Sequence, residues 1–267
     1  MDKIFINVPD GIKYLSDWNE FWATMPTGHC IVNKGVCGCG ATESFIRWAG
    51  KVILASPRKW LLYNKYSQHL GDYLHLYRFQ GDRKKFFEGA NCTQSDVLAY
   101  QNNLSRYIHS DGRKILTTYD SLGKVMEALY DSGENFGEWT VVVDEFQLIF
   151  HDCQFKADTE WGFTQLLQQF PTVVYLSATP FLENYLDALP EFQGLTMYEL
   201  RWPGQMVQTP HVEVVKTGKP VSELCCGLIA KYRAGEGRTK LMPDGSTFTA
   251  REAVFYINNV ALICKII

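Results

Sequence analysis

The chain has 267 residues, enough for one large domain or a domain and a half, and its 46% apolar and 21% charged residues are ordinary globular values. A net charge of −3 excludes a protein that binds nucleic acid through a general excess of basic residues, so any such surface must be local. No run approaches the roughly 18 apolar residues that a membrane span needs, and the first residues do not resemble a signal peptide. The eight cysteines match no paired zinc-ligand spacing, so we expect reduced thiols in a cytoplasmic protein.

Aromatic side chains recur every three to four residues near the start of the chain, at Tyr14, Trp18, Phe21 and Trp22. This spacing predicts an amphipathic helix that lies on the domain. Packing into the core accounts for these aromatics better than a base-stacking role does.

A glycine-rich loop follows a short strand that we expect over 29–34. Gly35, Gly38 and Gly40 lead into a helix expected over 43–49. Strand, glycine-rich turn and helix are the architecture of a phosphate-binding loop, in which backbone N–H groups and the positive helix end face the phosphates. A glycine-rich turn without a ligand is the alternative.

The spacing of this loop fits the P-loop pattern, with four residues between Gly35 and Gly40 and with Thr42 placed to ligate Mg²⁺. Ala41 stands where the pattern has a lysine. Lys34, just before the loop, is the candidate to reach the phosphates instead.

Two further strands are predicted to end in polar turns, one over 51–58 with Pro57 and Arg58, the other over 114–122. A helix over 122–130 should follow the latter. The intervening segment, 66–110, is rich in polar and charged residues, and we expect helices and surface excursions there. Its basic run at 83–85 is more typical of a solvated face than of a nucleic-acid contact.

Three consecutive valines, 141–143, predict a strand buried on both faces, because they show no alternation of apolar and polar residues. Asp144 and Glu145 follow directly and should emerge at the carboxyl edge of the sheet, where ligands bind in α/β folds. An aspartate there can hold hydrated Mg²⁺, and a neighbouring glutamate can polarise a water. On this stretch alone, a buried strand capped by acidic residues that start a helix is an equal reading.

A helix is expected around 165–170, and a fifth strand over 172–176 ends in Ser177 and Thr179. Strands that alternate with helices predict right-handed βαβ units and a parallel sheet with helices on both faces. The glycine-rich loop, the acidic pair and Ser177 then share one edge of that sheet.

Together these segments resemble the first RecA-like lobe of superfamily 2 helicases and related DEAD/DEAH-type ATPases, over about residues 28–182. The matching segments are 35–42 for motif I, 56–58 for motif Ia, 144–147 for motif II, 177–179 for motif III, and 117–122 for the Thr-Thr-Tyr stretch that contacts a strand backbone in many members. The resemblance implies an α/β, RecA-like fold of the P-loop NTPase type, with ATP and Mg²⁺ as ligands.

Site residues follow from the resemblance. Asp144 would hold Mg²⁺, Thr42 would complete the metal shell, and Glu145 would orient or deprotonate the attacking water. Gln147 would couple the nucleotide state to nucleic acid through Ser177 and Thr179. The nucleotide-binding set is Lys34, Gly35, Gly38, Gly40, Ala41 and Thr42, and the nucleic-acid contacts are Pro57, Arg58, Thr117, Thr118 and Tyr119.

The chain beyond this lobe looks like the start of a second one. We expect a first lobe over 1–205, then a linker and a truncated second lobe over 206–267. The expected elements are a Pro- and Gly-containing linker over 190–220, a strand at 211–215, a helix at 221–233, a hairpin or loop at 240–248, and at 253–259 the first strand of lobe two. No candidate for motifs V or VI exists, so we expect a longer protein that supplies the missing second RecA-like lobe.

The expected function is an ATP-binding, nucleic-acid-dependent ATPase or helicase module that acts on DNA or RNA, through a single-stranded backbone, and has no membrane role. The alternative is a degenerate lobe that binds nucleic acid or a protein as a scaffold without hydrolysing ATP, a reading that Ala41 favours. A small kinase is a third reading, against which the ordered set of motifs argues.

Overall fold

The computed structural model describes residues 2–18, 20–21, 28–69, 73–88, 92–151, 162–178, 186, 190–203, 218, 220–236, 239–241 and 247–249. The chain divides into two compact units, Met1–Gln208 and Thr209–Ile267. Within the described ranges, no helix is long and apolar enough to cross a membrane.

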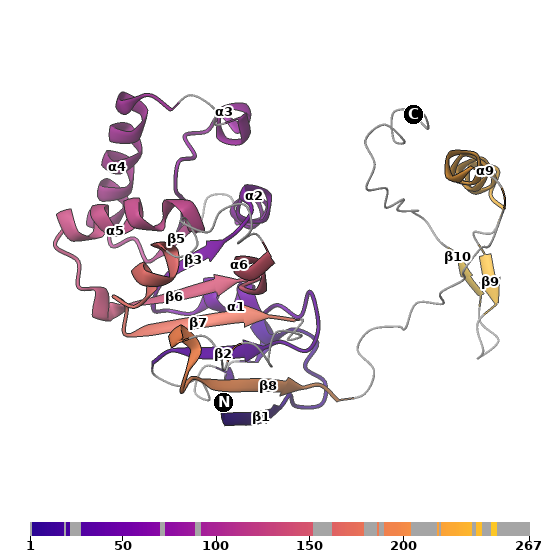
Figure 1. The fold of residues 1–267 in the computed structure, drawn as a ribbon, viewed down its shortest axis with the longest axis horizontal. Helices are drawn as coiled ribbons and strands as arrows, with labels where there is room; N and C mark the ends of the chain where they lie inside the picture. Colours follow the sequence, from indigo (N-terminus) through magenta and orange to yellow (C-terminus); the bar gives the residue numbers. More distant parts are fainter. Residues whose placement is uncertain are drawn as a thin grey trace. The chain divides into compact units, whose positions relative to one another are not determined.

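Eight strands of the first unit form one sheet, in the order β1-β8-β2-β7-β6-β3-β5-β4 (Figure 1). The strands are β1 (Asp2–Asn7), β2 (Cys30–Asn33), β3 (Lys51–Ser56), β4 (Leu74–Leu76), β5 (Lys114–Thr118), β6 (Trp139–Asp144), β7 (Thr172–Ser177) and β8 (Thr196–Arg201). Every neighbouring pair is parallel. The predicted α/β class with a parallel sheet is therefore confirmed.

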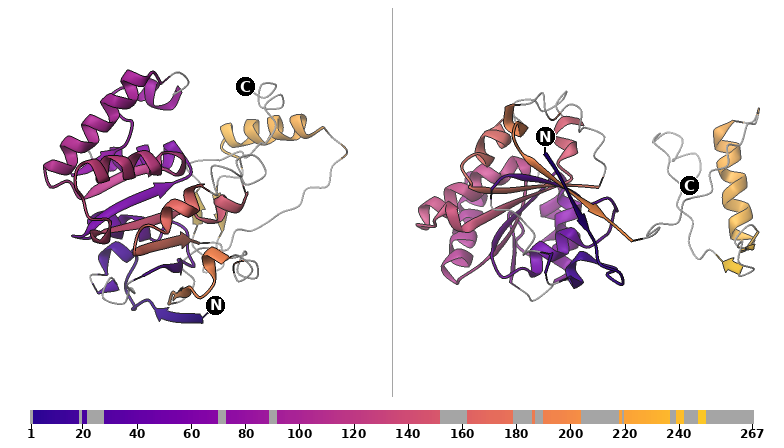
Figure 2. Two further views of the ribbon diagram at one scale, coloured as in Figure 1. Left: turned by 60° about the vertical axis from the view of Figure 1, so that its left-hand side comes forward. Right: turned by 90° about the horizontal axis from the view of Figure 1, so that it is seen from below.

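Helices cover both faces of this sheet, as Figure 2 shows. They are α1 (Ala41–Arg47), α2 (Lys59–Gln68), α3 (Arg83–Glu88), α4 (Gln94–His109), α5 (Leu122–Asp131) and α6 (Gln147–His151). Residues 162–167 are also helical. Three short 3-10 turns used below are η1 (Leu15–Asp17), η3 (Tyr119–Ser121) and η5 (Pro190–Phe192).

Two hydrophobic cores lie on the two faces, because successive side chains of a strand point in opposite directions. Val141 and Val143 of β6 belong to the core that includes the buried residues of α4 and α5. Val142 belongs to the other core, together with the buried residues of α1 and α2. All three valines are fully buried, as their lack of alternation predicts.

Local sequence signals explain the helices that pack on the first of these cores. The N–H of Asp96 donates to the Thr93 hydroxyl, and the N–H of Thr93 donates to the Asp96 carboxylate, which forms a capping box at the start of α4. In α5, Leu122, Val125 and Leu129 recur at helical spacing and are fully buried. Each helix is thus specified by its own residues before it meets the sheet.

Three strands of the first unit were not predicted. Residues 2–7, for which no element was predicted, form the edge strand β1, and β4 lies within 66–110, where helices and surface excursions were expected. Where an amphipathic helix was expected near Tyr14, the described residues contain the turn η1, and Trp22 lies outside them. The linker expected over 190–220 contains η5 and β8, which pairs with both β1 and β2. Pro and Gly near β8 mark the ends of a strand here, not a flexible connection.

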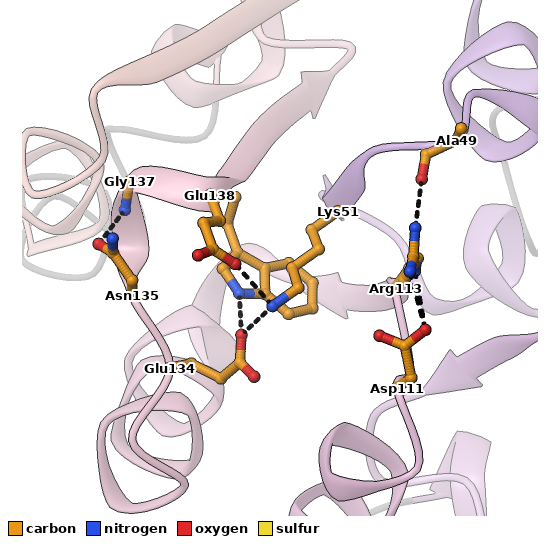
Figure 3. Close-up of polar contacts among 9 residues, drawn as sticks. Ala49, Lys51, Asp111, Arg113, Glu134, Asn135, Gly137 and Glu138 are labelled. Carbon is orange, nitrogen blue, oxygen red and sulfur yellow. Dashed lines mark hydrogen bonds and ion pairs between the residues drawn. The ribbon is translucent and has the colours of Figure 1, made fainter.

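An ion-pair cluster holds the amino-terminal edge of the sheet (Figure 3). Lys51, the first residue of β3, lies 2.6 Å from Oε2 of Glu134 and 2.9 Å from Oε2 of Glu138. The indole N–H of Trp139, at the start of β6, donates to Glu134 at 2.9 Å. These contacts tie the starts of β3 and β6 together, at the edge opposite the carboxyl ends of the strands.

The second unit contains α9 (Val221–Arg233), β9 (Thr239–Leu241) and β10 (Thr247–Thr249). The predicted helix over 221–233 is confirmed, and β9 and β10 pair antiparallel where a hairpin or loop was expected. The strands predicted at 211–215 and 253–259 lie outside the described residues.

Candidate functional site

The carboxyl ends of β2, β7 and β6 are neighbours in the sheet, with β7 in the middle. Asn33 pairs with Ser177, and Leu176 pairs with Asp144. The N–H of Lys34 continues the ladder by donating to the Ser177 carbonyl at 2.7 Å. The register therefore brings the glycine-rich loop after β2 and the acidic pair after β6 to one edge, as predicted.

All three glycines of the loop, Gly35, Gly38 and Gly40, have positive φ, so a side chain at any of them would be strained. Gly35 and Gly40 have φ of 67° and 80°, in the left-handed region that favours glycine. A Cβ at Gly35 would lie 3.0 Å from the carbonyl oxygen of Leu200, and one at Gly40 would lie 3.1 Å from Cβ of Tyr14. The loop is thus closely packed on both β8 and the N-terminal segment.

Lys34 is buried, and its ammonium group lies 3.2 Å from Oδ1 of Asp144 and 3.2 Å from Oε1 of Glu145. Burial by itself lowers the pKa of Lys34, but the two carboxylates outweigh it and the net pKa is raised. The side chain therefore carries its positive charge between the two acidic groups.

Asp144 is held by two hydroxyl groups besides Lys34. Thr42, in the first turn of α1, donates from Oγ1 to Oδ2 of Asp144 at 3.2 Å. Tyr119 donates from its hydroxyl to the backbone carbonyl of Asp144 at 2.7 Å. Carboxylate and hydroxyl oxygens are the ligands that Mg²⁺ takes in proteins, so Thr42 and Asp144 together fit a Mg²⁺ site.

Glu145 has a φ of 56°, which is uncommon for a residue with a side chain. Gln147 donates from Nε2 to Oε2 of Glu145 at 2.5 Å. Gln147 is buried, and its Oε1 has no hydrogen-bond partner among the described residues. A strained backbone beside a buried unpaired acceptor is typical of a functional site, because packing elsewhere must compensate for both.

Ala41 is 2% exposed and belongs to the core that contains Leu15 and Phe45. Its methyl group packs inside the protein, at the position where a P-loop has its lysine. Lys34, at the other end of the loop, places a positive charge beside Asp144 and Glu145.

A pocket of about 550 Å³ opens over this constellation. Its walls include the loop, Lys34, both carboxylates and, from other elements, Tyr14, Ser16, Arg47, Lys65 and Gln68. This volume is in the range of small-molecule and cofactor sites.

A second charged cluster, which the sequence did not reveal, lies beside the loop. The carboxylate of Glu43 is 2.9 Å from Nε of Arg47, 3.0 Å from Nε2 of His69 and 3.7 Å from Nζ of Lys65. Burial raises the pKa of Glu43, but the hydrogen bonds from His69 and Arg47 outweigh it, so the pKa is lowered. This cluster ties the end of α2 to the first turn of α1.

The residues predicted to contact nucleic acid differ in how far they are exposed to solvent. Arg58 is exposed, Pro57 and Thr118 are half-buried, and Thr117 and Tyr119 are buried. The Tyr119 ring stacks on Phe163 with centroids 4.4 Å apart, and its hydroxyl donates to the Asp144 carbonyl, so Tyr119 supports Asp144 from inside the fold. Sequence reasoning missed this role, because a Thr-Thr-Tyr stretch does not reveal which way the ring points.

One predicted site residue lies outside the described part of the chain, and one residue that contacts the loop was not predicted. Thr179 lies outside the described residues, so its place relative to Ser177 and Gln147 stays a prediction. Trp202 was not predicted at all, yet its indole N–H donates to the Lys34 carbonyl at 2.8 Å. No sequence signal links Trp202 to a loop that lies so far away in the chain.

No protein-family model matches the sequence, and no curated protein matches it. Among solved structures, a gluconokinase from Sinorhizobium meliloti 1021 is similar at 14% identity. The match covers 55% of this chain and 93% of that chain, with a TM-score of 0.26. A similarity this weak carries no argument about activity, so the helicase resemblance rests on the motifs of this chain alone.

Proposed function

We propose that the chain binds ATP with Mg²⁺ at this pocket and is the ATPase module of a nucleic-acid-dependent helicase or translocase of superfamily 2. The observation that carries the proposal is the position of Lys34, within 3.2 Å of both Asp144 and Glu145. A buried ammonium between two carboxylates supplies the charge that Ala41 lacks.

The residues present fit the proposed ligands. Glycines in the left-handed conformation let backbone N–H groups face an anion, and Lys34 adds a full positive charge. Thr42 and Asp144 offer a hydroxyl and a carboxylate to the metal. Mg²⁺, when bound, would neutralise negative charge on the phosphate oxygens.

Hydrolysis would then depend on positioning. Glu145 would accept a proton from the attacking water, and Gln147 would hold the Glu145 carboxylate in place through its 2.5 Å hydrogen bond. The ammonium group of Lys34 would move from the two carboxylates toward the phosphates, because it can neutralise the negative charge of either. Phosphoryl transfer is catalysed mostly by such positioning and charge neutralisation.

Nucleic acid would meet the same edge of the sheet. Ser56 and Thr118 end neighbouring strands in register, and exposed Arg58 follows β3 directly. Ser177 ends β7, which lies between β2 and β6. A movement of the glycine-rich loop after β2, or of the acidic pair after β6, would therefore reach Ser177. We propose DNA or RNA, bound through a single-stranded backbone, as partner, with a second RecA-like lobe supplied by a longer protein.

ATP hydrolysis by the wild-type chain and by Glu145→Gln, each with and without single-stranded DNA and RNA, tests this function. The expected result is hydrolysis that one nucleic acid stimulates and that Glu145→Gln loses while it still binds Mg²⁺-ATP. ATP binding without hydrolysis in the wild type, in the presence of either nucleic acid, would favour the scaffold instead. Absence of ATP binding would contradict the proposal for the pocket itself.

A further inference from the structure

An aromatic cluster joins α2 to α3, outside the pocket. Trp60 of α2 stacks on Phe87 with ring centroids 4.3 Å apart and planes at 24°. Tyr63, one turn further along α2, contacts Phe86, Phe87 and Phe79 through tilted or edge-on geometries at 5.4 to 6.3 Å. The inner members hold the two helices together, so the position of Trp60 is fixed from within.

Trp60 is nevertheless 51% exposed. Phe87 stacks on the Trp60 ring and the Arg83 guanidinium lies over it, yet about half of the residue stays in contact with solvent and offers apolar surface to a ligand. Rings in this position are the surfaces on which bases of single-stranded nucleic acid stack.

One cationic side chain packs on Trp60, and the same elements carry others. The guanidinium carbon of Arg83 lies 4.8 Å from the Trp60 ring centroid, Arg58 is the exposed N-cap of α2, and Lys84 and Lys85 are exposed on α3. Lys59 is engaged elsewhere, because its ammonium donates to the Phe86 carbonyl at 2.8 Å. The surface therefore combines an indole ring with positively charged groups.

Two acidic residues share this surface and do not cancel its charge. Asp82 accepts the backbone N–H of Lys85 at 3.1 Å and so caps α3. Glu88 lies 3.9 Å from Lys84, and both side chains are largely exposed, so this pair is weak. The same surface carries four basic side chains, Arg58, Arg83, Lys84 and Lys85. Its local charge is therefore positive, although the net charge of the chain is −3.

The cluster is continuous with the edge of the sheet that carries the proposed nucleic-acid contacts. Arg58 is the N-cap of α2, directly after β3, and Trp60 lies in the first turn of that helix. A single nucleic-acid strand whose backbone contacts Pro57 and Arg58 would therefore reach Trp60 next.

We propose that α2 and α3 form a binding surface for single-stranded nucleic acid, on which a base stacks against Trp60 while phosphates pair with Arg83, Lys84 and Lys85. The proposal rests on the nucleic-acid half of the proposed function and gives it a place. Sequence reasoning treated 83–85 as a solvated face, because the stacking of Arg83 on Trp60 is not visible in the sequence.

The test measures fluorescence anisotropy of labelled oligo(dT) and oligo(U), about 16 nucleotides long, titrated with the whole chain at several salt concentrations. The variants are Trp60→Leu, Trp60→Phe and Lys85→Glu. Matched controls are Tyr130→Leu and Lys124→Glu on α5, where an exposed aromatic and an exposed lysine lie on another helix. Mg²⁺-ATP binding is measured in parallel for every variant.

We expect Trp60→Leu to weaken binding about tenfold with an unchanged salt slope, and Trp60→Phe to recover most of the loss. Lys85→Glu should weaken binding and lower the salt slope by about one or more. Both controls should bind like the wild type, and ATP binding should be unchanged throughout. Lys85 is exposed, so its variant tests the surface even if Trp60→Leu fails to fold.

Oligonucleotide binding that Trp60→Leu and Lys85→Glu leave unchanged would overturn this surface while the proposed function stands. A wild-type chain that binds Mg²⁺-ATP but neither oligonucleotide would overturn the surface together with the nucleic-acid half of the function. A chain that binds oligonucleotide through this surface but no ATP would keep the surface and reject the ATPase.

Discussion

The ammonium group of Lys34 lies 3.2 Å from Oδ1 of Asp144, although 110 positions separate the two residues in the chain. The parallel sheet creates this contact, because Lys34 follows β2, Asp144 ends β6, and only β7 lies between them. The buried ammonium needs such a partner, and the half-buried carboxylate supplies it. The pair therefore fixes both groups at the edge where the phosphates are proposed to bind.

Ala41→Lys tests whether position 41 has become a packing position. Because Ala41 is 2% exposed in an apolar core, we expect the free energy of unfolding to fall by at least about 2 kcal/mol in urea titrations. The same substitution should not restore ATP binding to Lys34→Ala. A stable double variant that binds ATP as the wild type does would mean that the loop still accepts an ordinary P-loop lysine.

Tyr119→Phe removes the hydroxyl that donates to the Asp144 carbonyl and keeps the ring that stacks on Phe163. A lost hydrogen bond of this kind is worth about 1 kcal/mol, so kcat for ATP hydrolysis should fall about fivefold while KM changes little. Tyr107→Phe is the control, since its hydroxyl bonds the backbone of Lys114 away from the site. Equal effects of the two variants on kcat would exclude a positioning role for Tyr119.

Much of the fold follows from local patterns. The valines before Asp144 predict a doubly buried strand, and the glycines after β2 predict the turn at the carboxyl edge, because both depend on neighbouring residues only. The edge strand β1 was missed because its residues are mostly exposed. Strand β8 was missed because the Pro and Gly residues near it suggest a linker.

The candidate site was predicted in part for the same reason. Lys34, Thr42, Asp144 and Glu145 come together because the sheet orders their strands, and the motif order anticipates this. The contacts of Tyr119 and Trp202 depend on which way a ring points across the fold, and no local pattern encodes that.

Trp202→Phe tests the contact between the indole N–H and the Lys34 carbonyl. Loss of this bond should loosen the start of the loop and weaken Mg²⁺-ATP binding about fivefold in calorimetry. Trp139→Phe removes a comparable indole hydrogen bond at the opposite edge, to Glu134, and should lower stability without changing ATP affinity. If Trp202→Phe binds ATP with wild-type affinity, the contact does not shape the pocket.

His75 should make folding sensitive to acid. Burial lowers the pKa of His75 from 6.5 to about 4, so the unfolded chain takes up a proton at a higher pH than the folded chain does. Stability from this group is complete above about pH 6.5 and is lost as the pH falls toward 4. In urea titrations across this range, His75→Phe should lose less stability than the wild type or than His109→Phe, a variant on the exposed side of α4. Parallel pH profiles for His75→Phe and the wild type would contradict the assignment.

The most direct test of the account is Mg²⁺-ATP binding by calorimetry to the wild type, Lys34→Met and Lys51→Met. Both lysines contact two carboxylates, but Lys34 lies at the pocket and Lys51 at the opposite edge of the sheet. We expect Lys34→Met to weaken binding at least about tenfold, as loss of a hydrogen bond from a charged group does, and Lys51→Met to bind normally. Wild-type affinity in Lys34→Met would show that Lys34 does not replace the missing lysine of the loop.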